Sequence, residues 1–187
     1  MICRFVFSGS GGQGVITAAI VLAEAAVYHE ELNAVQTQSY GPEARGGAAR
    51  SDVILSTDEI QFPKVNQPNV LICLSSLAYS KYTWIVRPGG VVLIDPHTIK
   101  TKRTVDARQI EIPLYDTCMK ELGTALPVNI CLLGAMSELI GLVTRGSLEK
   151  VLKSRFSGDA QKLNIRALHL GADIVSRGPE IQPIQFL

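Results

Sequence analysis

The residues best placed to do chemistry are the glycines that follow the first predicted strand. Ile2–Phe7 is a β-forming run, and a helical pattern begins at Val15. Between them Gly9, Gly11 and Gly14 satisfy G-x-G-x-x-G. A strand, a glycine loop and a helix in that order present backbone N–H groups and a helix N-terminus to an anion, usually a phosphate. The pattern predicts a Rossmann-like first βα unit; a tight turn that binds nothing stays open as the alternative.

Two familiar nucleotide sites fit this loop poorly. A dinucleotide site needs an acidic residue near the end of the second strand, where this chain has Gln36, Thr37 and Gln38. A P-loop needs Lys and Ser or Thr where Val15 and Ile16 stand. A stand-alone dinucleotide-binding oxidoreductase is therefore disfavoured, and it remains an alternative.

A second glycine-rich loop, residues 39–47 with the sequence SYGPEARGG, follows the second predicted strand. We expect it at the carboxyl edge of the sheet, where ligands of open α/β sheets bind. Arg45 and Arg50 have the planar guanidinium that binds phosphate or carboxylate through two hydrogen bonds. A surface loop in which Arg45 pairs with Glu43 or with solvent is the equally favoured alternative.

Ligands for a metal or a cluster are not evident. The four cysteines are scattered and form no C-x-x-C pair, which argues against zinc and iron–sulfur frameworks in this chain. We expect two of them, Cys73 and Cys131, to be small buried hydrophobes because they lie in apolar runs. The histidines also lack ligand spacing; they are His29, His97 and His169.

No convincing catalytic set appears elsewhere in the sequence. There is no G-x-S-x-G nucleophile elbow. Lys100, Lys102 and Arg103 form a small basic cluster that is most simply a solvated loop, although it could contact a nucleotide phosphate. The chain therefore resembles one that assists chemistry carried out elsewhere.

Composition limits the class of protein. The 187 residues are 47% hydrophobic, and 18 basic against 17 acidic side chains leave a net charge of +1. Such a chain can build one sizeable core, and it carries no basic surplus for nucleic acid. The longest apolar stretch is too short to cross a membrane, and Arg4 interrupts the N-terminal apolar segment. We expect a cytoplasmic protein with one domain over residues 1–177 and an irregular tail over 178–187.

Alternating strands and helices predict an α/β fold, a three-layer α/β/α sandwich with a mostly parallel, mixed sheet. The long apolar helix 128–143 should be buried against the sheet, and Ser147 should be the N-cap of helix 148–156. The predicted strands are 2–7, 33–38, 51–56, 69–74, 90–94 and 106–113; the other predicted helices are 15–29, 78–86, 115–122 and 160–176.

Several of these motifs together resemble the gamma subunit of 2-oxoacid:ferredoxin oxidoreductases. The two glycine-rich blocks, residues 9–15 and 36–47, are the most specific part of the resemblance. Residues 62–65, 78–82, Asn129, Gly134 and 164–171 follow in the same order. The resemblance covers about residues 1 to 175. It is strongest to the 2-oxoglutarate branch, with the pyruvate and ketoisovalerate branches possible.

The resemblance implies a non-catalytic subunit of an enzyme that decarboxylates a 2-oxoacid to an acyl-CoA and passes electrons to ferredoxin. Thiamine diphosphate and iron–sulfur clusters would belong to alpha, beta and delta partner subunits, and this chain would contribute coenzyme A binding and assembly. A ligand-free scaffold is the structural alternative, and an isolated chain is expected to self-associate. The implied cofactor-binding residues are Gly9, Gly11, Gly12, Gln13, Gly14, Ser39, Tyr40, Gly41, Arg45 and Gly46.

Overall fold

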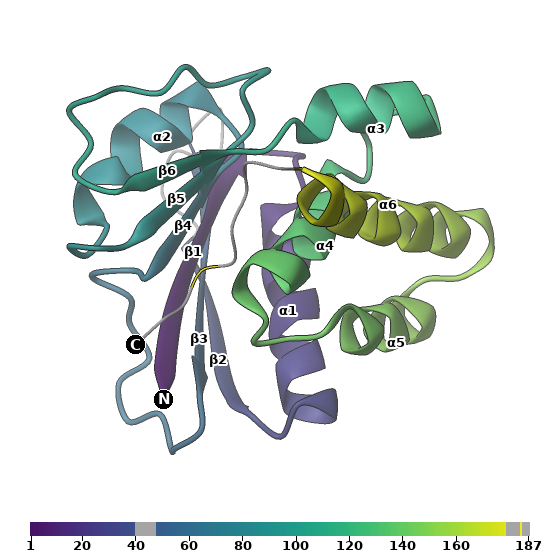
Figure 1. Cartoon of the computed structure of the whole chain (residues 1–187). Helices are drawn as coiled ribbons and strands as arrows, with labels where there is room; N and C mark the ends of the chain where they lie inside the picture. Colours follow the sequence, from purple (N-terminus) through teal and green to yellow (C-terminus); the bar gives the residue numbers. More distant parts are fainter. Residues whose placement is uncertain (40–47, 179–183, 185–187) are drawn as a thin grey trace.

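The computed structural model describes residues 1–39, 48–178 and 184. Six strands form one sheet (Figure 1): β1 (Ile2–Ser10), β2 (Asn33–Ser39), β3 (Ala48–Ser56), β4 (Val70–Cys73), β5 (Val91–Ile94) and β6 (Arg108–Glu111). The helices in the described residues are α1 (Val15–His29), α2 (Ser76–Tyr82), α3 (Leu114–Leu122), α4 (Val128–Ile140), α5 (Arg145–Arg155) and α6 (Gly158–Arg177), with a short 3-10 helix at Thr83–Ile85.

The sheet is mixed, as predicted, and its strand order is β2-β3-β1-β4-β5-β6. β1, β4, β5 and β6 are parallel, whereas β3 is antiparallel to both of its neighbours. The first strand and helix keep the Rossmann-like arrangement. The next strand, β2, is not the neighbour of β1, because β3 lies between them. In a dinucleotide-binding fold the second strand lies next to the first and carries the acidic residue that binds the ribose. Here β3 takes that place, so β2 does not lie next to β1.

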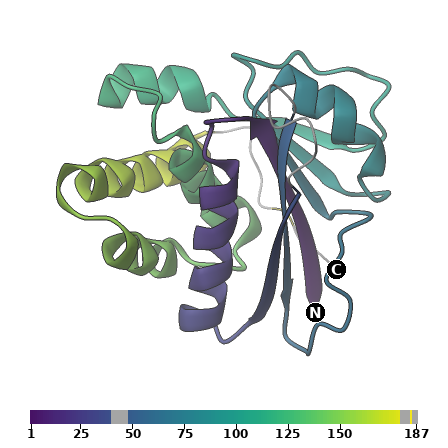
Figure 2. The same ribbon diagram turned by 180° about the vertical axis from the view of Figure 1, so that it is seen from behind.

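Helices cover both faces of the sheet unequally (Figure 1). Alternate residues of β1 divide between the faces: Phe5 and Phe7 pack with α1 and α4, and Val6 packs with α2. On the first face α5 and α6 add an outer layer that contacts α1 and α4 (Figure 2). The predicted three layers are therefore present, with α2 and the short 3-10 helix on one side and a double layer of helices on the other.

The long apolar helix is buried as predicted, although it stops at Ile140, where Gly141 takes a left-handed conformation with φ 69°. One cap prediction was wrong. α5 begins at Arg145, and its N-cap is Thr144, whose hydroxyl accepts a hydrogen bond from the Ser147 backbone N–H at 3.2 Å. Ser and Thr are both good N-cap residues. Thr144 is the N-cap here because its backbone is extended, whereas Ser147 is already within the helix.

The crossing of α4 and α6 requires two glycines. A Cβ on Gly134 would lie 1.9 Å from the Leu168 carbonyl oxygen, and a Cβ on Gly171 would lie 1.7 Å from the Cys131 carbonyl oxygen. Each glycine therefore allows the backbone of the opposite helix to approach. This close contact holds the outer helix α6 against α4, whose first residues border the glycine loop.

Candidate functional site

The glycine loop lies at the carboxyl ends of two neighbouring strands, β1 and β4, whose following helices go to opposite faces of the sheet. β1 leads into α1 on one face of the sheet, and the adjacent parallel strand β4 leads into α2 on the other. Crevices of this kind, at the carboxyl ends of the strands, are where open α/β sheets bind ligands. The loop thus lies between a strand and a helix, as its sequence predicted, and the structure adds its place in this crevice.

The Gln13 side chain lies inside this loop and hydrogen-bonds to backbone on two sides of it. Its side-chain Oε1 accepts a hydrogen bond from the Ser10 backbone N–H at 2.7 Å, and its Nε2 donates to the Leu74 carbonyl at 2.9 Å. A Cβ on Gly9 would lie 2.6 Å from that Oε1. Gln13 therefore ties the β1 loop to the end of β4, and it fills space that a bulkier residue at position 9 would need.

The remaining loop glycines differ in what they can contact. Gly14 is pressed against Asn129, whose Nδ2 donates to the Gly14 carbonyl at 3.0 Å, and a Cβ there would meet that amide at 2.5 Å. Gly11 and Gly12 are exposed, with open space around their Cα atoms, and Gly12 has φ 86°. Of the predicted glycine set, these two have an exposed backbone, whereas Gly9 and Gly14 allow close packing.

A cavity of about 210 Å³ adjoins the loop. Its lining is largely apolar, with a few polar groups. The lining residues are Gly12, Gln13, Leu74, Asp95, Thr98, Tyr115, Ala125, Leu126 and Val128. They come from the ends of β1, β4 and β5 and from the starts of α3 and α4. Small-molecule sites typically combine apolar walls with a few placed polar groups in this way.

Asp95 is the functional candidate that the sequence interpretation missed. Its side chain is 2% exposed and accepts hydrogen bonds from the backbone N–H groups of His97, at 3.0 Å, and Tyr115, at 2.7 Å. Burial raises the pKa of this carboxyl, partly offset by those two N–H groups. An acidic residue directly after the apolar strand Val91–Ile94 was the available signal.

The second predicted loop joins β2 to β3 at the same edge. Ser39 ends β2 opposite Arg50, and Ala48, which begins β3, lies opposite Ser10 of β1. Tyr40, Gly41, Arg45 and Gly46 lie outside the described residues. Ala48 therefore lies beside the glycine loop, whereas Ser39 lies one strand farther from β1.

Arg50, the second arginine considered as an anion ligand, has other partners. Its guanidinium forms two bonds to the Asp52 carboxylate, at 2.6 and 2.9 Å, and donates to the Val65 carbonyl at 2.7 Å. It also lies 5.4 Å from the centre of the Tyr82 ring. Arg50 thus bonds to groups on the α2 side of the sheet, and Arg45 lies outside the described residues.

In the described part of the chain, the cysteines are buried, and two of the histidines contact neighbouring side chains. All four cysteines are buried and unpaired, and burial raises the pKa of the Cys73 thiol to about 12. No group of three or more potential metal ligands occurs among the described residues. His97 stacks on Tyr115 and approaches Asp116, and His169 approaches Glu149. In the ranges that the structure describes, no helix is long and apolar enough to span a membrane.

Comparison with known proteins gives consistent matches over most of the chain. The family model for pyruvate ferredoxin/flavodoxin oxidoreductase matches residues 4–174. The 2-oxoglutarate synthase subunit KorC of Methanocaldococcus jannaschii is 40% identical over 169 residues, covering 89% of this chain and 90% of its own. The KorC subunit of Archaeoglobus fulgidus is 40% identical over 170 residues, covering 91% and 86%.

Solved structures of 2-oxoacid:ferredoxin oxidoreductases also match this chain. The gamma subunit of a keto/oxoacid ferredoxin oxidoreductase from Geobacter sulfurreducens superposes with a TM-score of 0.82 at 34% identity, over 91% of this chain and 94% of that one. A 2-oxoglutarate:ferredoxin oxidoreductase from Magnetococcus marinus, solved with 2-oxoglutarate, coenzyme A and succinyl-CoA bound, shares the fold with a TM-score of 0.86 at 21% identity. The match covers 100% of this chain and 33% of that one.

The fold and these matches define the class: the chain belongs to the pyruvate ferredoxin/flavodoxin oxidoreductase family. Within it, the chain is a gamma-type subunit of a multi-subunit 2-oxoacid:ferredoxin oxidoreductase, which confirms the resemblance. The alternative of a stand-alone dinucleotide-binding oxidoreductase is set aside.

Proposed function

We propose that this subunit binds coenzyme A for the oxidative decarboxylation of 2-oxoglutarate by the assembled enzyme. The observation that carries the proposal is the exposed Gly11–Gly12 backbone beside an apolar cavity at the divergence of β1 and β4. The exposed N–H groups suit the diphosphate of coenzyme A, and Arg45 is the cation that would neutralise part of its charge.

Relatives support the choice of 2-oxoacid. The M. jannaschii and A. fulgidus relatives are subunits of 2-oxoglutarate synthases, and the M. marinus enzyme holds coenzyme A and succinyl-CoA. Other relatives belong to ketoisovalerate and pyruvate/ketoisovalerate enzymes at 31–32% identity, which makes those acids the second choice.

The proposed division of labour leaves thiamine diphosphate and the iron–sulfur clusters to partner subunits of alpha, beta and delta type, in the cytoplasm. Buried, scattered thiols and the lack of a ligand cluster among the described residues support this division. This chain then holds the thiol substrate at the interface and performs no redox step itself.

The test uses the assembled complex. Gly12→Asp places a carboxylate where the diphosphate would sit, and we expect the KM for coenzyme A to rise at least about tenfold, with 2-oxoglutarate KM unchanged. Arg45→Ala should weaken coenzyme A binding in the same direction. Gly158→Asp is the matched control, because Gly158 also has positive φ, 60°, and open space but begins α6. If both site variants bind coenzyme A like the wild type, the subunit is a ligand-free scaffold.

A further inference from the structure

The side of the sheet that α2 covers has a thinner helical layer than the other side. α2 and the 3-10 helix lie directly on this side, whereas on the other side α5 and α6 add an outer layer (Figure 1). Among the described residues, therefore, no second layer of helix covers the outer side of α2. This outer side is open to a partner.

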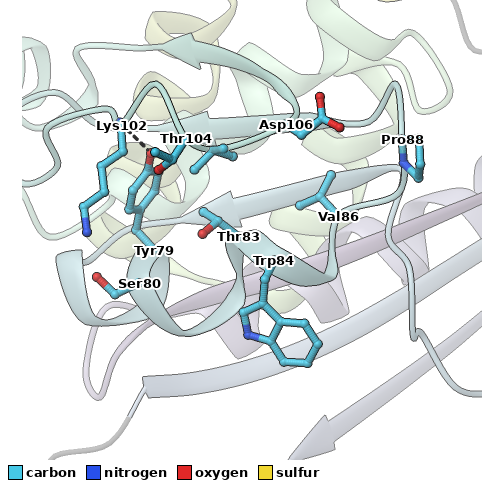
Figure 3. Close-up of a pocket in the computed structure, with 10 residues that line it drawn as sticks. Tyr79, Ser80, Thr83, Trp84, Val86, Pro88, Lys102, Thr104 and Asp106 are labelled. Atoms are coloured by element: carbon cyan, nitrogen blue, oxygen red, sulfur yellow. Dashed lines mark hydrogen bonds between the residues drawn. The ribbon is translucent and has the colours of Figure 1, made fainter.

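Two large apolar side chains project from the outer side of α2 and the 3-10 helix. Tyr79 and Tyr82 are buried against the sheet, whereas Leu77 and Trp84 are 49% and 80% exposed. Leu77 and Trp84 lie two helical turns apart, a spacing that places them on the same side. Figure 3 shows the Trp84 ring pointing outward, away from Asp106. The two side chains form an apolar stripe on the surface.

The orientation of the Trp84 ring is fixed. Its Nε1 donates to the Lys81 carbonyl at 2.6 Å, so the indole is held in place before any partner arrives. A side chain ordered in this way loses little conformational freedom on binding. Tryptophan is also one of the residue types that contribute most to the binding free energy of protein interfaces. Trp84 therefore has the properties of a central interface residue.

The part of the chain that forms this side is strongly basic. Residues 60–108 hold seven basic and two acidic side chains, a net charge of +5, whereas the rest of the chain holds 11 and 15, a net charge of −4. Apart from residues of β1 and β3, every side chain in the apolar cluster on this side comes from residues 60–108. Asp95 is buried, so Asp106 is the one exposed acidic residue of this stretch. Positive charge is thus concentrated on one side of the molecule.

Three exposed cations lie in the segment before β6, namely Lys100, Lys102 and Arg103. None of them forms an ion pair with a residue in the described ranges. Lys102 and Trp84 both border a cavity of about 430 Å³ between this segment and α2 (Figure 3). The Tyr79 hydroxyl accepts a hydrogen bond from the Lys102 backbone N–H at 2.9 Å, which holds the basic segment against α2. The cations and the apolar stripe therefore adjoin one another.

We propose that this α2 face, made up of Leu77, Trp84, Lys100, Lys102 and Arg103, docks an acidic surface of another subunit of the same enzyme. Apolar side chains of that subunit cover the stripe, and its carboxylates pair with the three cations. Charge complementarity favours this occupant. Two copies of the chain joined through the same face would bring like charges together. The chain is a subunit of a multi-subunit enzyme, and the docking does not depend on where coenzyme A binds.

Zero-length cross-linking of the assembled enzyme tests this contact directly. A carbodiimide couples a lysine amine to a carboxylate that touches it, and mass spectrometry then identifies the two side chains. We expect Lys100 or Lys102 to be joined to an Asp or Glu of a different subunit. The yield should fall severalfold between about 0.05 M and about 0.5 M salt, because salt screens exposed charges.

Variants of the assembled enzyme measure how much the face contributes to binding. Trp84→Ala should raise the dissociation constant of this subunit at least about tenfold, measured by dilution and size-exclusion chromatography. Lys100→Glu combined with Lys102→Glu should have an effect of similar size. The matched control is Arg145→Glu combined with Lys150→Glu, two exposed cations of α5, and it should assemble like the wild type. Each isolated variant should unfold within about 2 °C of the wild type, because the changed side chains are exposed.

Any of three results would overturn the proposal. In the first, neither Lys100 nor Lys102 is cross-linked to another subunit. In the second, they are cross-linked only to another copy of this chain, which would make the face a site of self-association. In the third, the control variant dissociates as readily as the Lys100→Glu/Lys102→Glu variant. The KM for coenzyme A, measured on the same preparations, tests the proposed function separately.

Discussion

At the residue scale, Gln13 is a positioning residue for the glycine loop. Its amide makes two hydrogen bonds to backbone, one within the β1 loop and one to the end of β4. We expect Gln13→Ala to lower the free energy of unfolding by about 1–2 kcal/mol and to raise the KM for coenzyme A in the assembled enzyme.

Gln161 provides the control for that prediction. Its side-chain amide also makes two hydrogen bonds to backbone, both donated by Nε2, to the carbonyls of Lys153 and Phe156 at the junction of α5 and α6. Gln161→Ala should lower stability by a similar amount, measured by urea unfolding, and leave the coenzyme A KM unchanged. Equal effects of the two variants on KM would contradict the positioning role.

Asp95 makes stability depend on pH in a defined direction. Because burial raises its pKa above the ordinary 3.8, the folded protein holds this proton more tightly than the unfolded chain does. The stability gained from protonated Asp95 is complete below the ordinary pKa and is lost as pH rises through the folded value. The unfolding free energy of the wild type minus that of Asp95→Asn should therefore fall as the pH rises from below 3.8 through the folded-state pKa. A difference that is constant or rises with pH would contradict this.

At the element scale, the α4–α6 crossing has little room for any side-chain atom. Gly171→Ala directs a methyl group at the Cys131 carbonyl, and we expect a loss of about 3 kcal/mol in the free energy of unfolding. Gly146→Ala is the matched change in another helix, α5, where the nearest atom to the new Cβ is 3.9 Å away. It should be neutral or stabilising by up to about 1 kcal/mol. Thermal unfolding of both variants distinguishes packing from helix propensity.

Local pattern predicts the elements of this protein well and their spatial order poorly. The bounds of α1 were predicted from Val15 to His29, because Gly14 marks the start and a helical run rich in Ala and Leu extends to His29. Nothing in the sequence of β3 indicates that it is inserted antiparallel between β1 and β2. That order depends on how the strands bury their faces together, which is a property of the whole sheet.

For the candidate site, the sequence likewise predicted the location of the loop but not the role of each residue in it. The glycine loop could be located from its spacing, whereas the roles of its members depend on partners distant in sequence, such as Leu74 for Gln13 and Asn129 for Gly14. Arg50 could not be distinguished from Arg45 by residue type. Its partners Val65 and Tyr82 approach only when α2 folds onto the sheet.

At the scale of the whole molecule, a large apolar side chain remains exposed beside the proposed coenzyme site. Leu126 is 85% exposed at the cavity beside the glycine loop. Leu126→Ser should change the unfolding free energy of the isolated chain by less than about 0.5 kcal/mol, because the side chain buries almost nothing there. In the assembled complex we expect weaker subunit retention on size-exclusion chromatography or a higher coenzyme A KM. An assembled enzyme unaffected in both respects would leave Leu126 as a solvent-exposed residue.

The strand pairings at Ser39–Arg50 and Ala48–Ser10 have a consequence for how this family can diversify. The eight residues 40–47 connect two strands that are hydrogen-bonded to each other over Asn33–Ser39 and Arg50–Ser56. Doubling the length of such a connection adds only about 0.6 kcal/mol of closure entropy. Insertions and exchanges in this segment should therefore cost the sheet little free energy, and under the proposed function they offer a way to vary the coenzyme site on an unchanged sheet.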